Sequence, residues 1–160
     1  MSLIRKATSY FAAAVLSAAG ITFAGAAPAQ AASWTDCPAG DSGWVCLWEG
    51  PNYTGGRWQA SKAVLEGGQS GGVYGCHNLT DAHYTNGKLV YDTASSWAIR
   101  PIDYTEQTLD GNVTFYEWIN CNNAGKHRTY RGYGEYAVGD LSTLSPSFND
   151  TVASILISYN

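Results

Sequence analysis

The stretch Cys46-Leu-Trp-Glu-Gly-Pro-Asn-Tyr-Thr-Gly-Gly56 is the most informative segment of this 160-residue chain for its fold. It joins a short apolar run to a turn in which two aromatic residues, Trp48 and Tyr53, stand five positions apart. A Pro-Asn pair lies between them, and two glycines follow. Glycine takes backbone conformations with positive φ that other residues resist, so this order predicts a folded β-hairpin whose turn is closed by an aromatic side chain.

The same order returns in the second half of the chain. Tyr116-Glu-Trp-Ile-Asn-Cys121 keeps the aromatic and the acidic residue after it, and places a cysteine at the position of Tyr53. Glycine is reached two residues late, at Gly125. The chain therefore contains an internal repeat of its decisive turn.

Two further landmarks recur in the same order. Asn78-Leu79 is echoed by Asp140-Leu141, and Asp92-Thr-Ala-Ser-Ser-Trp-Ala-Ile99 is echoed by Asp150-Thr-Val-Ala-Ser-Ile-Leu-Ile157. An aspartate before the last strand of each half is expected to hold a tight turn by bonding its own backbone. The repeat predicts two four-stranded Greek keys, at about residues 43–100 and 112–160.

Short stretches rich in aromatic and β-branched residues alternate with clusters of Gly, Asn, Asp and Pro, and helical periodicity is almost absent. This rhythm is typical of an antiparallel all-β domain. The many turns favour a sandwich over an open sheet. The expected strands include Trp44–Trp48, Lys88–Tyr91, Val113–Tyr116 and Val152–Tyr159.

The N-terminus has the three parts of a secretory signal peptide. A basic start at Arg5-Lys6 precedes an Ala-rich apolar run, residues 10–27, and Ala29-Gln30-Ala31 supplies small residues for cleavage. We expect cleavage after residue 31, within a residue or two, to leave a secreted single domain of 129 residues, 32–160. A retained membrane anchor is the alternative, which the lack of a second apolar segment long enough to span disfavours.

The mature chain is acidic. Removal of the two N-terminal basic residues leaves 7 Lys and Arg against 13 Asp and Glu, a net charge of about −6. Nucleic acid and anionic lipid bind clusters of Lys and Arg, so neither is expected as a partner. We expect a monomer that does not contact membranes after cleavage.

All four cysteines, Cys37, Cys46, Cys76 and Cys121, lie in the mature chain. An even number in an exported protein predicts two disulfides. Three pairings are possible and the sequence alone does not choose among them; we favour Cys37 with Cys46, across a turn-rich segment, and Cys76 with Cys121. Zinc is the weaker alternative, because there is no Cys-x-x-Cys pair and the histidines lack regular ligand spacing. These histidines are His77, His83 and His127.

These motifs resemble the βγ-crystallin superfamily, whose Greek keys carry an aromatic, an aromatic and a glycine in the first hairpin and an Asn/Asp-rich Ser-Ser motif before the last strand. The resemblance covers Trp44 to Tyr159. The signal peptide, the Cys-Pro-x-Gly opening, Cys-Leu-Trp with Asn-Tyr-x-Gly, and the Asn-Cys turn are also similar to the secreted bacterial metalloproteinase-inhibitor family (SMPI-type). This resemblance implies a βγ-crystallin-like β-sandwich that inhibits an extracellular, thermolysin-like metalloproteinase.

An inhibitor of this kind needs a rigid, substrate-like loop, and the resemblance implies an apolar residue just after the bond that the peptidase attacks. Two loops offer one: residues 67–76 contain Val73, and residues 116–125 contain Ile119. The second loop is better braced, because a cysteine lies inside its turn. We therefore place the inhibitory segment at Trp118, Ile119, Asn120 and Cys121. The alternative is that Trp118 and Ile119 end a strand and pack.

The superfamily motif Asn/Asp, Asn/Asp, two free positions, Ser/Thr, Ser supplies the hard oxygen ligands that calcium prefers. In this chain the copy at residues 91–96 keeps Ser95 but opens with Tyr91, and the copy at residues 149–154 has Ala153 at the ligand position. Calcium is therefore expected to bind weakly or not at all, and no other cofactor is expected. The better of the two sites comprises Asp92, Thr93 and Ser95.

Other classes of function find less support. No serine lies in a Gly-x-Ser-x-Gly elbow, and residues 67–72 lack the Lys-Ser/Thr ending of a phosphate-binding loop. Glu49 and Glu117 could form a glycosidase pair, but the repeat explains them as duplicated structural positions. Six tryptophans are too many for one small core to bury completely. A carbohydrate-binding or cell-wall module, or a structural crystallin-like module, is therefore the alternative function.

Overall fold

The computed structural model describes residues 33–38, 43–100, 111–131 and 137–159, and the expected signal peptide at residues 1–31 lies outside them. The described residues form short strands, single-turn 3-10 helices (η) and a short α-helix. In chain order they are η1 (Trp34–Asp36), β1 (Trp44–Trp48), η2 (Pro51–Tyr53), β2 (Arg57–Ser61), α1 (Lys62–Glu66), β3 (Gln69–Ser70), β4 (Val73–Tyr74), β5 (Cys76–Asn78), β6 (Ser96–Arg100), β7 (Gly111–Tyr116), η3 (Ile119–Cys121), β8 (His127–Arg131), β9 (Ala137–Asp140), η4 (Leu141–Thr143) and β10 (Ser154–Tyr159).

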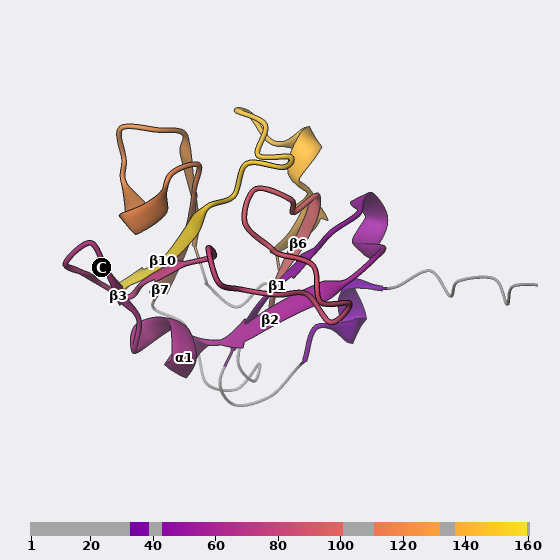
Figure 1. The fold of residues 1–160 in the computed structure, drawn as a ribbon, viewed down its shortest axis with the longest axis horizontal. Helices are drawn as coiled ribbons and strands as arrows, with labels where there is room; N and C mark the ends of the chain where they lie inside the picture. The colour runs from indigo at the N-terminus through magenta and orange to yellow at the C-terminus, as the bar shows by residue number, and fades with distance from the viewer. Residues whose placement is uncertain (1–32, 39–42, 101–110, 132–136, 160) are drawn as a thin grey trace, which may run out of the picture.

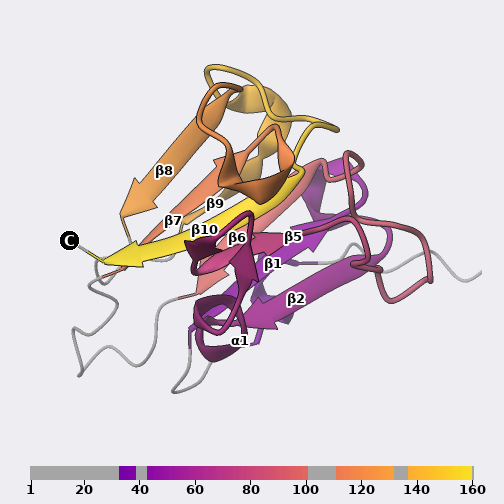
Figure 2. The ribbon, with the colours of Figure 1, turned by 60° about the vertical axis from the view of Figure 1, so that its left-hand side comes forward.

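Two four-stranded antiparallel sheets enclose the core (Figure 1). The first sheet has the order β2-β1-β6-β9, and the second has the order β5-β10-β7-β8. Figure 2 shows β8, β7 and β10 on one side of the molecule and β1 and β2 on the other. The short hairpin β3–β4 forms a separate two-stranded sheet.

The two halves of the chain exchange one strand each. Leaving aside the small β3–β4 hairpin, the third strand of the first half is β5. It pairs with β10 of the second half, with Ser154 opposite Asn78. Reciprocally, β9 of the second half pairs with β6 of the first, with Ser96 opposite Asp140. Each half is thus a Greek key whose third strand lies in the other sheet. The prediction of an all-β sandwich of two Greek keys is confirmed.

The core lies between the sheets, because every second residue of each strand points inward. Val45 and Leu47 of β1 share this core with Ile155 of β10, and all three are almost completely buried. Trp97 of β6 lies edge-on to Phe115 of β7, with 5.5 Å between the ring centroids. Aromatic and branched side chains from both sheets therefore interlock across the sandwich.

Each sheet carries a buried disulfide outside this central core. Cys37–Cys46 ties the N-terminal segment to β1 of the first sheet, in a cluster with Trp48. Cys76–Cys121 joins β5 of the second sheet to η3, in a cluster with Tyr116. These are the two pairs that we favoured from the sequence.

The connection between β5 and β6 differs from our expectation. We predicted a strand at Lys88–Tyr91, but this connection contains only an isolated bridge between His83 and Leu89. The chain crosses here from the second sheet to the first, and its apolar side chains Tyr84 and Val90 enter the core. The apolar pattern of this segment therefore reflects burial and not strand pairing.

One helix was not expected, and two strands start at other residues than predicted, β7 at Gly111 in place of Val113 and the last strand at Ser154. The structure has a short helix at Lys62–Glu66, which begins where the Ser61 hydroxyl accepts a hydrogen bond from the backbone N–H of Val64 at 3.4 Å. The last strand starts at Ser154, because Val152 and Ala153 belong to the buried turn that precedes it.

Candidate functional site

The turn Trp118–Cys121, which contains the predicted inhibitory segment, is held by a buried serine. The Ser154 hydroxyl donates to the carbonyl oxygen of Trp118 at 2.6 Å and accepts from the backbone N–H of Cys121 at 3.1 Å. Ser154 has no solvent exposure and is the first residue of β10. A single side chain therefore satisfies two backbone groups that the tight turn removes from the strand ladder.

A second clamp on this turn comes from the other half of the chain. The Asn78 side chain accepts from the backbone N–H of Asn120 at 2.7 Å, and its amide donates to the Asn120 side-chain oxygen at 2.9 Å. Asn120 and Cys121 have φ of 61° and 49°, in the left-handed region that most side chains avoid. The Cys76–Cys121 disulfide is a third tether, so the turn is fixed along its whole length.

The first turn is held in the same way. Ser96 Oγ donates to the carbonyl of Gly50 at 2.8 Å and accepts from the N–H of Tyr53 at 3.0 Å. Asp140 Oδ1 accepts from the N–H of Asn52 at 2.8 Å. Each turn is therefore clamped by a serine of its own half and by an Asn or Asp of the other half, which explains why these landmarks repeat in the sequence.

Asp92 and Asp150 complete this network through their backbones. Both have positive φ, 55° and 53°. Their N–H groups bond across the halves, to the carbonyls of Val152 at 3.2 Å and Ala94 at 2.9 Å. We expected each aspartate to bond its own backbone; instead, the Asp150 carboxylate accepts from the Ser95 hydroxyl at 3.2 Å.

The two turns differ in the side chains that they present to solvent. The first turn has Gly50 and Pro51 where the second has Trp118 and Ile119, which are 47% and 40% exposed. The backbone before the two 3-10 turns is nearly identical: φ and ψ are −108° and 163° at Gly50, and −113° and 154° at Trp118. The same scaffold therefore exposes two large apolar side chains in only one of its two copies.

The tryptophans are partly buried and partly exposed, as the sequence suggested. Of the two glycines expected to have positive φ, one does. Trp48 and Trp97 are buried, whereas Trp118 is exposed. Gly55 has the expected positive φ of 78°, but Gly125 does not lie in that region. A Cβ atom at Gly125 would approach the Trp118 ring to 3.1 Å, so a larger residue there would require a small shift of that ring.

The structure brings the two loops considered for inhibition together. The tip of the β3–β4 hairpin lies against η3, because a Cβ atom built on Gly71 would be 2.5 Å from Cβ of Asn120. The strand that follows the hairpin carries Cys76, the disulfide partner of Cys121. Val73 and Ile119, the apolar residue in each loop, have similar exposure, 38% and 40%.

The predicted calcium ligands Asp92, Thr93 and Ser95 make contacts within the protein. The Thr93 hydroxyl bonds to the Leu89 carbonyl at 2.7 Å, and Ser95 is almost completely buried against Asp150. Burial raises the pKa of the Asp92 carboxyl, and a hydrogen bond from Tyr91 opposes this shift. In the described ranges, no three His, Cys, Asp or Glu side chains gather where they could hold a metal ion.

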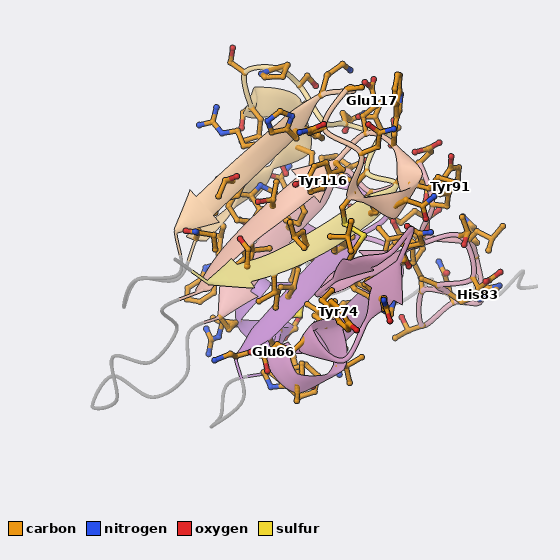
Figure 3. The ribbon with its side chains drawn as sticks, turned by 90° about the vertical axis from the view of Figure 1, so that its left-hand side faces the viewer. Glu66, Tyr74, His83, Tyr91, Tyr116 and Glu117 are labelled. Atoms are coloured by element: carbon orange, nitrogen blue, oxygen red, sulfur yellow. A yellow bond between two sulfur atoms is a disulfide. The ribbon has the colours of Figure 1, made fainter. Side chains whose placement is uncertain are left out.

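Glu49 and Glu117 each form a separate ion pair. Figure 3 shows Glu117 at the surface of the molecule. Glu49 accepts from the Lys88 ammonium and from the Asn86 amide, and Glu117 pairs with Lys126 at 2.9 Å. The hydrogen bonds from Lys88 and Lys126 lower the pKa of the two carboxyls. A glycosidase acid needs a raised pKa, so this pair does not suit that chemistry.

Two Greek keys that exchange their third strands define the βγ-crystallin class of β-sandwich. Within that class, the sequence matches the model of peptidase inhibitor family I36 over residues 30–130, and the chain belongs to this family. The matched region includes both clamped turns and all four cysteines.

Solved structures with a similar fold are distant in sequence. One, described as "Evolution of the eye lens beta-gamma-crystallin domain fold", has a TM-score of 0.48 and 15% identity, and covers 77% of this chain and 92% of that chain. A double mutant of a βγ-crystallin domain from Clostridium beijerinckii has a TM-score of 0.36 and 21% identity, and covers 71% and 94%. A search of curated proteins finds no match.

The clamp on the second turn predicts a large effect of Ser154→Ala. This change leaves the Trp118 carbonyl and the Cys121 N–H without the hydroxyl that bonds both of them. The free energy of unfolding should therefore fall by about 2–3 kcal/mol. Urea denaturation of the oxidised protein measures it. Ser142→Ala, at an exposed position, is the control and should change stability by less than about 0.5 kcal/mol. Equal effects of the two substitutions would contradict the clamp.

The contacts of Thr93 and Ser95 predict weak calcium binding or none. Any dissociation constant should lie at roughly 0.1–1 mM or above, the range of extracellular modules. Calorimetric titration of metal-stripped protein with calcium measures it. Low-micromolar affinity would show that these hydroxyls leave their partners to bind the ion.

Proposed function

We propose that this protein is a secreted inhibitor of an extracellular, thermolysin-like metalloproteinase, and that the turn Trp118–Cys121 is the segment that enters the peptidase active site. Membership of a peptidase inhibitor family supports the general activity. The observation that carries the choice of segment is the rigid turn with two exposed apolar side chains, Trp118 and Ile119.

Rigidity is the property that a substrate-like loop needs most. A flexible loop loses conformational entropy when it binds, whereas a loop already fixed in its bound shape loses little. Here Ser154, Asn78 and the disulfide hold the backbone, and they leave the side chains of residues 118 and 119 free to contact a partner. A chain cleaved in this turn would also keep its ends in place, since clamps lie on both sides of Ile119.

The first turn serves as an internal comparison. It has the same clamps, which shows that the clamps belong to the fold and do not by themselves indicate inhibition. Tyr53 occupies the position of Cys121 and packs edge-on against Trp48, with 5.2 Å between ring centroids. Gly50 and Pro51 offer no large apolar side chain, so the first turn lacks the feature that we assign to inhibition.

The disulfides are consistent with export. Structural disulfides form and persist in oxidising, extracellular surroundings, which supports action on an extracellular peptidase. In the part of the chain that the structure describes, no helix is long and apolar enough to cross a membrane.

One observation supports carbohydrate binding as a second candidate function. Trp118 presents an exposed indole, and Asn122 and Asn123, four and five positions later in the chain, are also exposed; exposed aromatic rings stack on sugars. This function would use the same turn. Binding of the oxidised protein to insoluble cell-wall polysaccharide, measured with the parent and with Trp118→Ala, tests it separately from inhibition.

Transfer of the first turn's residues to the second turn tests the proposed segment. The double variant Trp118→Gly, Ile119→Pro copies Gly50-Pro51 onto a turn whose backbone conformation resembles that of the first turn, so folding should persist. Loss of two central apolar contacts should raise the inhibition constant about 100-fold or more. Titration of a thermolysin-like metalloproteinase measures it, with circular dichroism as the check of folding.

Leu89→Ala, at an exposed apolar position outside the two loops, is the matched control and should inhibit like the parent. Serine and cysteine peptidases control for target class. Unchanged inhibition by the double variant would place the inhibitory segment elsewhere. Inhibition of only a serine or cysteine peptidase would contradict the metalloproteinase target.

A further inference from the structure

We propose that the β3–β4 hairpin and the turn Trp118–Cys121 form one continuous peptidase-binding surface, in which Tyr74 is a second aromatic anchor. This inference rests on the proposed function and extends the proposed contact beyond the inhibitory turn. We call this region the hairpin–turn surface; its exposed apolar side chains are Val73, Tyr74, Trp118 and Ile119.

Exposed apolar side chains concentrate on this surface. Among the described residues, six large hydrophobic side chains are exposed, and four of them belong to the hairpin–turn surface. The other two, Val64 and Leu89, lie on α1 and on the β5–β6 connection. Isolated exposed apolar residues are ordinary, but a group on two joined loops marks a site of interaction.

The same region contains no formal charge. Residues 67–80 and 118–125 contain no Asp, Glu, Lys or Arg, although the chain as a whole is acidic. The centres of protein interfaces are depleted in charged residues and enriched in Tyr and Trp. The centre of this surface therefore suits an uncharged, largely apolar part of a peptidase cleft, and charged residues flank the two segments in the sequence: Glu66, Asp81, Glu117 and Lys126.

Close packing holds the hairpin against the turn. The space where Gly71 would carry a Cβ atom is filled by the Asn120 side chain, which also pairs with Asn78. At its base the hairpin is joined to β10, because the carbonyl oxygen of Gly75 accepts a hydrogen bond from the N–H of Ile157 at 3.0 Å. The hairpin is thus braced by the same residue, Asn120, that the second clamp holds.

Tyr74 has the properties of an anchor. Its side chain is 79% exposed, the highest fraction among these apolar residues. Figure 3 shows it on the face turned toward the viewer, between Glu66 and Tyr116. Tyrosine gives a large contact area and loses little side-chain entropy on binding, which is why it is common in binding surfaces.

Substitution of Tyr74 tests the anchor. Tyr74→Ala should raise the inhibition constant for the metalloproteinase at least about 10-fold, and Tyr74→Phe should preserve most of the inhibition if ring contact dominates. Leu89→Ala again serves as the control. Circular dichroism and thermal unfolding confirm that each variant folds.

Two adjacent glycines provide a matched test of the contact between hairpin and turn. Gly71 and Gly72 both have positive φ, 60° and 82°, so alanine strains the backbone at either position. Only at Gly71 does the new Cβ meet Asn120; at Gly72 it meets nothing within 4 Å. Gly71→Ala should therefore weaken inhibition by at least about 10-fold more than Gly72→Ala.

The outcomes separate this inference from the proposed function. Weaker inhibition by Tyr74→Ala, together with a larger effect of Gly71→Ala than of Gly72→Ala, supports the shared surface. If Tyr74→Ala inhibits like the parent while Trp118→Gly, Ile119→Pro does not, the inference is overturned and the proposed function stands. Equal effects at the two glycines overturn the shared surface. A parent protein that inhibits no metalloproteinase overturns both.

Discussion

The structure depends on two turns in which consecutive residues adopt left-handed backbone conformations. Asn52-Tyr53 and Asn120-Cys121 turn their N–H groups away from the strand ladder, and buried groups of this kind need partners. The buried serines Ser96 and Ser154 supply one partner each, and Asp140 and Asn78 supply the other. Because Asp140 ends β9 and Asn78 ends β5, satisfying each turn brings the third strand of one half beside the other half. The exchange of strands and the geometry of the turns are thus one arrangement.

The duplication leaves one turn free to vary. In the first half, Tyr53 packs on Trp48, and Gly50-Pro51 completes a turn without large exposed side chains. In the second half, Cys121 replaces the tyrosine and bonds to Cys76, so a covalent tether takes the place of aromatic packing. The turn then presents Trp118 and Ile119 without losing its shape. A binding surface can evolve on such a scaffold with little cost in stability, because the serine and Asn/Asp clamps hold the backbone whatever the exposed residues are.

The sequence predicted the features that follow from local repeats. Trp48-x4-Tyr53, its counterpart at Tyr116, and the Ser96 and Ser154 positions identified the two Greek keys, since each landmark has a local backbone role. It did not predict features that depend on distant contacts. The sequence shows that Asn78-Leu79 is repeated as Asp140-Leu141. It does not show that the side chains of Asn78 and Asp140 accept hydrogen bonds from the turn of the opposite half. Lys88–Tyr91 has the composition of a strand because Val90 is buried, and Gly125 lies against the Trp118 ring. The proximity of the hairpin to the second turn depends on Gly71 and Asn120, which are 49 positions apart in the sequence.

Hydrogen exchange at four backbone amides measures directly whether the two turns are clamped. Clamping of both turns requires the N–H groups of Asn52, Tyr53, Asn120 and Cys121 to be bonded in the native state, so NMR should show slow exchange at all four in the oxidised protein. Their opening free energies should approach that of global unfolding, as for amides of the central strands. Fast exchange at Asn120 and Cys121, with protected strands around them, would show that the second turn is neither clamped nor rigid.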